Sequence, residues 1–346
     1  MHNMPLVIAS LLLSFFLAFL VTTRVLPFMI VRMKARRITG IDVNKYEKPK
    51  IAEMGGICVW LGFSAGIIAS IFVFSYLKWI EIDLTFLLAG FTTTIVVGFL
   101  GVIDDLIGWK TGIRQWQHAL IPVFAALPLM AIKVSNPPIM IPFFGFAPAE
   151  YVIPFVGVVS FGLIYSLIFV PIGVTGASNA TNMLAGLNGL EAGLGAIISA
   201  TMLAVALTQG KMEAAIVSIA MLGALIAFLR FNWYPARVFG GDSLTLMIGA
   251  SIATAAILGN IEKIGVLLLA IYFVELALKM RFKMQKEGFG IPAKDGTLHA
   301  PKQVASVTHV VMRMGNFTEK RVVEIILAMQ AVVSILVFSV SYFKLF

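Results

Sequence analysis

The stretch "FLLAGFTTTIVVGFLGVIDD" (86–105) places two adjacent carboxylates after eighteen uncharged residues. An uncharged run of this length suits a helix that crosses most of a bilayer. Adjacent carboxylates repel each other, and burying either one without a partner is costly. We therefore expect a membrane helix ending at Asp104 and Asp105, with a positive group close to them. Arg114 follows nine residues later, at the start of the next apolar run. A solvated helix end is the alternative interpretation.

The whole chain shares the apolar character of this stretch. Of its 346 residues, 60% are hydrophobic and only 12% are charged. A water-soluble protein of this size could not bury so much apolar surface. The apolar runs continue for about 20 residues without strand-like alternation, which predicts helices rather than a membrane barrel. The single cysteine, Cys58, excludes an intramolecular disulfide and most cysteine-based metal sites.

The hydropathy pattern predicts an all-α integral membrane protein with about ten transmembrane helices, forming a single polytopic domain over residues 1–346. The first apolar run lacks a small-residue cleavage site and precedes a basic cluster, so we interpret it as a retained span rather than a signal peptide. We find no convincing internal repeat and no soluble domain between the spans. The expected spans are 5–31, 52–77, 84–104, 115–133, 151–174, 189–209, 212–230, 242–259, 261–280 and 322–343.

The basic residues are unevenly divided between the two sides of this predicted bundle. In or beside the loops, 20 Lys and Arg residues fall on one side and 5 on the other, with Arg24 inside the first span. The positive-inside rule places the basic side in the cytoplasm and both termini outside. The net charge of +9 then indicates orientation and anionic lipids or substrates rather than nucleic acid. We expect a multi-pass protein of the cell membrane, or of the ER membrane in a eukaryote, whose active site faces the cytoplasm.

An asparagine-rich stretch lies on the cytoplasmic side. In "SNATNMLAGLNGLEAG" (178–193), Asn179 and Asn182 share a helix face, and Asn188 follows a bend that contains glycine. Helix capping and turn formation account for one or two asparagines, but less readily for three. Amide oxygens are also suitable ligands for Mg²⁺.

Two Gly-Gly pairs on the same side lie next to carboxylates. "RVFGGDSLTLMIGA" (237–250) starts a span with Asp242, which could cap the helix or hold a metal bound to a diphosphate. "NKYEKPKIAEMGGICVW" (44–60) places Glu53 shortly after a run of lysines that suits anionic lipid. His299 stands in the last and longest loop, where a lone histidine is more often incidental than catalytic.

Carboxylates, amide oxygens and cations together define the candidate chemistry. Hard oxygen ligands indicate Mg²⁺ or Mn²⁺, and the cations indicate phosphate. Metal-assisted phosphoryl transfer is therefore the leading class of reaction. A secondary transporter or flippase would keep its polar residues near the bilayer midplane. An intramembrane prenyltransferase would need two aspartate-rich motifs, and the sequence has a single Asp-Asp pair.

Four motifs, "KPKIAEMGG", "GFLGVIDD", "NATNMLAGLNGLEAG" and "FGGDS", resemble the polyprenyl-phosphate N-acetylhexosamine-1-phosphate transferase superfamily. They are most similar to its eukaryotic and archaeal dolichyl-phosphate GlcNAc-1-phosphate transferases. The resemblance implies Mg²⁺-dependent transfer of GlcNAc-1-phosphate from UDP-GlcNAc to a polyprenyl or dolichyl phosphate, with release of UMP. This reaction would be the first membrane step of a lipid-linked glycan pathway such as N-glycosylation. Membrane lipids are expected partners, and the resemblance allows a homodimer.

The resemblance also implies catalytic and metal-binding roles. Asn182 and Asp242 match the Mg²⁺ ligands of the family, and Asp104 and Asp105 match its paired aspartates. Arg114 stands where the family usually has a basic residue. We favour direct attack of the lipid phosphate on the β-phosphate of the donor, with Asp104 assisting deprotonation or orientation. A covalent aspartyl intermediate remains an alternative.

Substrate contacts follow from the same motifs. Asn188 and Phe239 match positions that line the uridine pocket, and Glu53 and Lys48 match the motif near the acceptor phosphate. The histidine clusters of bacterial relatives are reduced here to His299, which disfavours a muramyl-pentapeptide donor. The remaining substrate-binding candidates are Asn179, Arg281 and His299.

Overall fold

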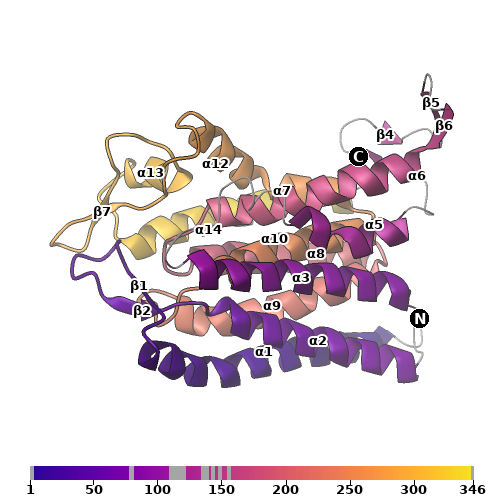
Figure 1. Cartoon of the computed structure of the whole chain (residues 1–346), viewed down its shortest axis with the longest axis horizontal. Helices are drawn as coiled ribbons and strands as arrows, with labels where there is room; N and C mark the ends of the chain where they lie inside the picture. The colour runs from indigo at the N-terminus through magenta and orange to yellow at the C-terminus, as the bar shows by residue number, and fades with distance from the viewer. Residues whose placement is uncertain are drawn as a thin grey trace.

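A computed structural model describes residues 4–77, 82–108, 122–133, 140–141, 145–146, 150–153 and 157–343. Long helices lie side by side and form the body of the molecule (Figure 1). They are α1 (Met4–Ala35), α2 (Gly56–Leu77), α3 (Leu84–Gly108), α7 (Val170–Met183), α8 (Leu190–Thr208), α9 (Met212–Asn232), α10 (Asp242–Gly259) and α14 (Glu319–Tyr342). The shorter helices are α5 (Leu127–Lys133), α6 (Phe161–Ile164), a π-helix at Tyr165–Phe169, α11 (Glu262–Leu268), α12 (Ala270–Met280) and α13 (Val307–Met312).

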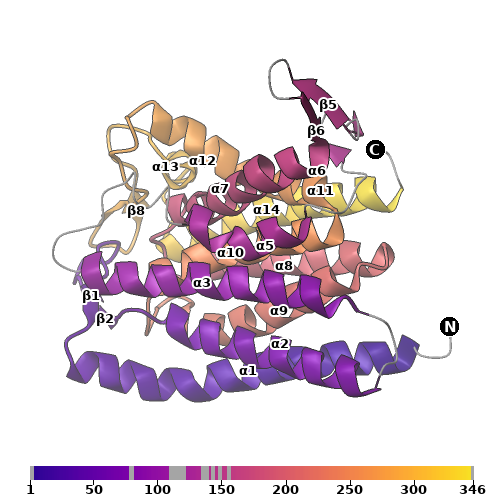
Figure 2. The same cartoon turned by 45° about the vertical axis from the view of Figure 1, so that its right-hand side comes forward.

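Among the described residues, four short antiparallel hairpins accompany the helices. They are β1 (Thr39–Ile41) with β2 (Lys50–Ala52), β3 (Met140–Ile141) with β4 (Gly145–Phe146), β5 (Glu150–Ile153) with β6 (Gly157–Ser160), and β7 (Ile291–Pro292) with β8 (Leu298–His299). The sequence did not predict them, because strands of two to four residues are too short to show alternation. The first and last hairpins lie at one end of the helical body, and β5–β6 lies at the other (Figures 1 and 2).

The structure agrees with the expected class of integral membrane protein. Among the described residues, eight helices are long and apolar enough to cross a membrane. Seven of them coincide, within a few residues at each end, with expected spans. The fourth expected span, 115–133, lies partly outside the described residues. The remaining helix, Phe161–Met183, is displaced from the fifth expected span, and the ninth expected span is interrupted.

The fifth span begins ten residues later than expected. The sequence placed it at 151–174, but β5 and β6 occupy 150–153 and 157–160, and the helical segment runs from Phe161 to Met183. Ser160 caps this segment, since its hydroxyl oxygen accepts a hydrogen bond from the backbone N–H of Leu163 at 3.4 Å. Valine and isoleucine count as strongly in hydropathy as helix formers do, yet they also favour strands.

The ninth span is broken in the middle. α11 ends at Leu268 and α12 begins at Ala270. The Gln330 side chain of α14 donates a hydrogen bond to the carbonyl of Leu268 at 3.1 Å. A buried carbonyl released by a helix break needs such a donor. The carbonyl at the break is thus bonded by a side chain from another helix, and the residue at the break, Leu269, is neither glycine nor proline.

α10 occupies the centre of the bundle, where nearly all its residues are buried. It packs against α3, α7, α8, α9 and α2. Two glycines permit the closest approaches. A side chain at Gly101 of α3 would meet the backbone of Asp242, and one at Gly249 of α10 would lie 2.2 Å from the Ala177 carbonyl of α7.

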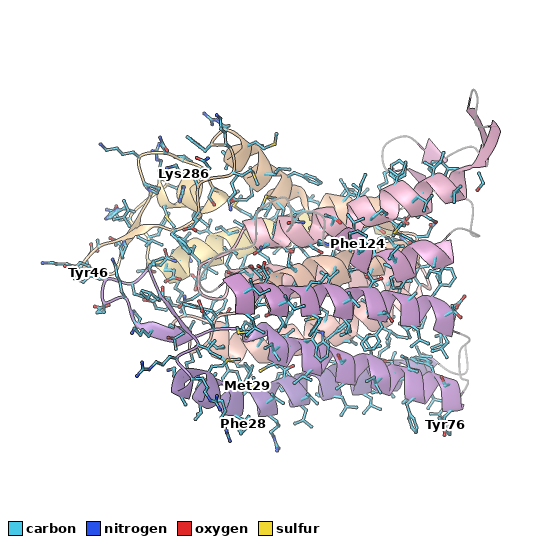
Figure 3. All side chains as sticks on the ribbon, viewed as in Figure 1. Phe28, Met29, Tyr46, Tyr76, Phe124 and Lys286 are labelled. Atoms are coloured by element: carbon cyan, nitrogen blue, oxygen red, sulfur yellow. The ribbon has the colours of Figure 1, made fainter. Side chains whose placement is uncertain are left out.

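The chain returns to the end from which it starts. α1 begins and α14 finishes at the same end of the bundle (Figure 1). The opposite end gathers β1–β2, β7–β8 and the connections between α7 and α8 and between α9 and α10. Figure 3 shows Tyr46 at this end and Tyr76 at the other. In the described part of the chain, the loops that the sequence assigned to one side of a membrane therefore meet at one end of the molecule.

The close approach of α10 to α7 should be sensitive to a single methyl group. We expect Gly249→Ala to destabilise the protein by about 1–3 kcal/mol, because the new methyl would overlap the Ala177 carbonyl. Gly173→Ala is the matched control, since a side chain at Gly173 meets no atom within 4 Å. Thermal unfolding in detergent measures both variants. Equal melting temperatures for the two would contradict this account of the packing.

Candidate active site

A cavity of about 220 Å³ opens at the end of the bundle where the loops gather. Its walls come from the first hairpin, the α7–α8 connection, the start of α10 and the last loop. Two aromatic rings, Phe239 and Phe289, line it together with several polar side chains. These polar side chains are Asp42, Glu53, Asn182, Glu191, Asn232 and Asp242. The cavity thus brings together four sequence-predicted residues, which are Glu53, Asn182, Phe239 and Asp242.

Asp105 fixes the N-terminus of α10. Its Oδ1 accepts a hydrogen bond from the backbone N–H of Asp242 at 2.7 Å, and its Oδ2 accepts one from Ser243 at 3.1 Å. Gly241 has φ +74°, and a side chain there would lie 2.5 Å from Asp105 Oδ2. The helix N-terminus carries partial positive charge, which offsets the charge of this half-buried carboxylate. Asp105 therefore acts as a clamp between α3 and α10.

Asp242 does not cap its own helix. The N-cap position belongs to Gly241, and Asp242 is the first helical residue. The first backbone donors are satisfied by Asp105 instead. The capping alternative considered from the sequence is therefore wrong, and the Asp242 side chain lines the cavity. Asp104, next to the clamp on α3, is 5% exposed.

The asparagine-rich stretch splits into two environments. Asn182, near the end of α7, accepts a hydrogen bond at Oδ1 from the Thr245 hydroxyl at 3.0 Å and lines the cavity. Asn179, one turn earlier, donates to the Thr175 carbonyl at 2.8 Å and is not part of the cavity wall. The expected bend follows α7, where Gly186 and Gly189 have positive φ.

Asn188, in this bend, is 2% exposed, and its amide is held by the protein. Its Oδ1 accepts hydrogen bonds from the Ala236 N–H at 2.8 Å and from Lys45 Nζ at 3.1 Å. Its Nδ2 donates to Asp42 Oδ2 at 3.2 Å. An asparagine amide can make four such bonds, so three of its four are used within the chain. Asn188 is therefore buried next to the cavity but does not line it.

Glu53 and Phe239 enter the cavity from adjacent segments. The backbone of Phe239 pairs with the first hairpin, donating to the Ala52 carbonyl and accepting from the Gly55 N–H, each at 2.8 Å. Glu53 lies between these contacts and packs against Gly40. Burial raises the pKa of Glu53, and the nearby Asp105 carboxylate raises it further. Glu53 therefore takes up a proton more readily than a solvated glutamate does.

The other predicted residues lie outside this cavity. Lys48, Arg281 and His299 are exposed and do not line it. His299 lies 3.3 Å from the Thr297 hydroxyl, within the last loop. Arg114 lies outside the described residues.

His309, which the sequence did not single out, holds the last loop in place. It is 2% exposed, accepts from the Ala305 N–H at Nδ1 and donates from Nε2 to the Phe289 carbonyl. This pairing assigns the neutral tautomer. Burial is the main cause that lowers the pKa of His309. Because Phe289 lines the cavity, His309 positions one of its walls.

The donor set of the cavity fits a hard divalent cation. Asn182 and Asp242 offer an amide and a carboxylate oxygen, the ligand types that Mg²⁺ prefers. Asn182 Oδ1 uses one of its two lone pairs for Thr245, which leaves the other for a metal. Within the described part of the chain, no three His, Cys, Asp or Glu side chains form a metal-binding group. A cation held by Asn182 and Asp242 would take its other ligands from water or substrate phosphate, as Mg²⁺ commonly does.

Comparison with known proteins identifies the family. The model of glycosyl transferase family 4 matches residues 85–260. A relative from Saccharolobus solfataricus, provisionally named UDP-N-acetylglucosamine–dolichyl-phosphate N-acetylglucosaminephosphotransferase, is 33% identical over 332 residues, or 95% of each chain. This protein therefore belongs to glycosyl transferase family 4, and this relative is named as a transferase of a phosphosugar.

Two further relatives bear on the particular reaction. A Dictyostelium discoideum protein, named UDP-N-acetylglucosamine–dolichyl-phosphate N-acetylglucosaminephosphotransferase, is 25% identical over 371 residues, covering 94% of this chain and 87% of its own. A phospho-N-acetylmuramoyl-pentapeptide-transferase of Halalkalibacterium halodurans is 31% identical over 281 residues, covering 77% of this chain and 80% of its own. The similarity to the first type of protein thus extends over more of the chain.

The clamp by Asp105 can be tested without substrate or metal. Asp105→Asn would place an NH₂ group against one of the two backbone donors, so we expect a loss of about 1–3 kcal/mol in stability. Asp295→Asn is the control, because this carboxylate also accepts a backbone N–H, from Thr297, but is exposed. Chemical or thermal unfolding in detergent measures the difference. A variant as stable as the parent would show that the clamp does not hold α10.

Proposed function

We propose that this protein transfers GlcNAc-1-phosphate from UDP-GlcNAc to a polyprenyl or dolichyl phosphate and releases UMP. The observation that carries the proposal is the meeting of Glu53, Asn182 and Asp242, from three distant segments, in one cavity. The names of relatives that match nearly the whole chain support this donor and this acceptor. As the step that attaches the first sugar to the lipid, the reaction would begin a lipid-linked glycan.

The proposed reaction is a single displacement at phosphorus. An oxygen of the lipid phosphate forms a bond to the β-phosphorus of UDP-GlcNAc, and the bond from that phosphorus to the bridging oxygen breaks. UMP leaves with the bridging oxygen, and the lipid carries GlcNAc through a diphosphate. Holding the two phosphates in line removes much of the entropic barrier to this step.

The chain's own residues divide the work in this proposal. Asn182 and Asp242 would hold Mg²⁺, which supplies charge stabilisation to the diphosphate. Asp105 keeps Asp242 at the cavity through the α10 N-terminus, which makes it a positioning residue rather than a nucleophile. Asp104 orients or deprotonates the acceptor phosphate. Glu53, with its raised pKa, is suited to carry a proton beside it.

The remaining candidates would contact the substrates either inside the cavity or on the surface around it. Phe239 offers a ring on which the donor base can pack. Lys48, Arg281 and His299 are exposed near this end, where they can attract phosphate before it enters. Arg114 keeps the role of offsetting the paired aspartates. Asn179, expected from the sequence to bind substrate, would instead support the helix that carries Asn182.

We also propose that the cavity faces the cytoplasm, in the cell membrane or the ER membrane. The division of basic residues, 20 against 5, supports this orientation through the positive-inside rule. It also fits the chemistry, because a nucleotide sugar is water-soluble while its acceptor lies in the bilayer. A site at the end of a membrane bundle can receive both. A transporter, in contrast, would collect its polar residues at mid-bundle.

The reaction is identified by the nucleotide it releases. Purified protein, Mg²⁺, dolichyl phosphate and a panel of UDP-sugars should yield UMP with UDP-GlcNAc and require the lipid. UMP rather than UDP is the diagnostic product, because only phosphosugar transfer cleaves the diphosphate. Release of UDP, or UMP formation without lipid phosphate, would refute the proposed reaction.

The two proposed metal ligands have a stronger test than activity alone. We expect Asn182→Ala and Asp242→Ala each to lower turnover by roughly two to three orders of magnitude, because each removes several kcal/mol of transition-state stabilisation. Asn316→Ala, an exposed asparagine in the last loop, should leave turnover unchanged. Gel filtration checks that all three variants stay folded. Near-parent turnover of either variant at saturating Mg²⁺ would exclude that residue as a ligand.

A further inference from the structure

Asp42 is a buried carboxylate in the cavity wall that the proposed reaction does not use. It is 3% exposed. Its Oδ2 accepts hydrogen bonds from Lys45 Nζ at 3.0 Å and from Asn188 Nδ2 at 3.2 Å. None of the described residues donates a hydrogen bond to its other oxygen, Oδ1. Oδ1 is not fully enclosed by protein atoms, and Asp42 lines the cavity, so this oxygen can accept a hydrogen bond from a ligand there.

Lys45 is fully engaged by the protein behind this wall. Its ammonium group donates to Asp42, to Asn188 Oδ1 at 3.1 Å and to Glu319 at the start of α14. It also lies 4.3 Å from the centre of the Tyr234 ring. A lysine has three N–H donors, and these three partners use all of them. Lys45 is therefore built to hold Asp42 in place and not to bind a substrate phosphate.

The charges around Asp42 select the kind of ligand that Oδ1 can take. A phosphate would be repelled by the carboxylate, and the attraction of this carboxylate for a metal ion is offset by the Lys45 ammonium group, 3.0 Å from Oδ2. A neutral N–H or O–H donor remains. Phe239 lines the same cavity and offers its ring to a base. A uridine nucleotide carries both kinds of neutral donor, the imide N–H of its base and the hydroxyls of its ribose.

We propose that Asp42 Oδ1 accepts a hydrogen bond from the nucleoside of the donor substrate, and that Lys45, Asn188 and Glu319 keep it oriented for this purpose. This inference rests on the proposed function. It makes Asp42 a specificity-determining residue and Lys45 a positioning residue.

Asp42→Asn tests the contact by reversing its polarity. Lys45 and Asn188 both donate to Oδ2, so the substituted amide must keep its oxygen toward them and turn its NH₂ group to the cavity. We would measure binding of UMP, CMP and 2′,3′-dideoxy-UMP to the parent and the variant by calorimetry. If the imide N–H is the partner, the preference for UMP over CMP should fall about tenfold to a hundredfold. If a ribose hydroxyl is the partner, UMP and CMP should weaken together while the dideoxy analogue is unaffected.

Equal losses for all three nucleotides, or no loss for UMP, would overturn the inference, because a merely structural role does not depend on the ligand's donors. The parent alone also tests it if the variant fails to fold. A parent that binds UMP, CMP and the dideoxy analogue equally would exclude the contact. Glu324→Gln is the control, since this carboxylate belongs to an exposed ion pair with Arg321 and should leave all affinities unchanged. A parent that binds no UMP would contradict the proposed function itself.

Discussion

The carboxylate of Asp105 at the N-terminus of α10 is the interaction on which the candidate site depends. It satisfies two partly buried backbone donors at the start of the helix, which have no partner within the helix itself. It also ties α3 to the central helix at the level where the cavity opens. With Gly101 and Gly241 allowing the close approach, α3 and the Gly-Gly turn before α10 take up a single arrangement. In this arrangement Gly241 occupies the N-cap position, so Asp242 does not cap the helix.

The rest of the cavity is held by side chains that come from far along the chain. The α7–α8 connection is bonded at Gly186 by Asn44 and Glu191, at Asn188 by Glu319 and at Gly189 by Asn232. Such contacts place backbone N–H and C=O groups as firmly as a secondary-structure element would. A site that must orient two phosphates benefits from this rigidity, because misplacement of reacting groups is costly in rate.

The sequence predicted the membrane class, most of the spans and the segments that meet at the site, because these depend on local hydropathy and on motifs. The sequence could not distinguish the roles of the two paired aspartates. Asp104 and Asp105 have the same local signal, and only the position of α10 makes one of them a clamp. Likewise, the carbonyl at the break near Leu269 is bonded by Gln330, which is far away in the chain. Lys45 contacts Asn188 and Glu319, and the sequence alone does not show that these distant residues meet it beside Asp42. The segment "DVNK" (42–45) did offer one indication of this pair, because it places opposite charges three residues apart in a candidate loop.

The central claim is that the loop-built cavity binds the metal and the nucleotide sugar together. Anomalous X-ray scattering from Mn²⁺, in crystals grown with UDP-GlcNAc, tests it most directly, because Mn²⁺ accepts the same oxygen ligands as Mg²⁺. The account predicts one strong peak between the side chains of Asn182 and Asp242, beside the diphosphate of the donor. A peak at another place, or a nucleotide bound away from Phe239 and Asp42, would contradict it.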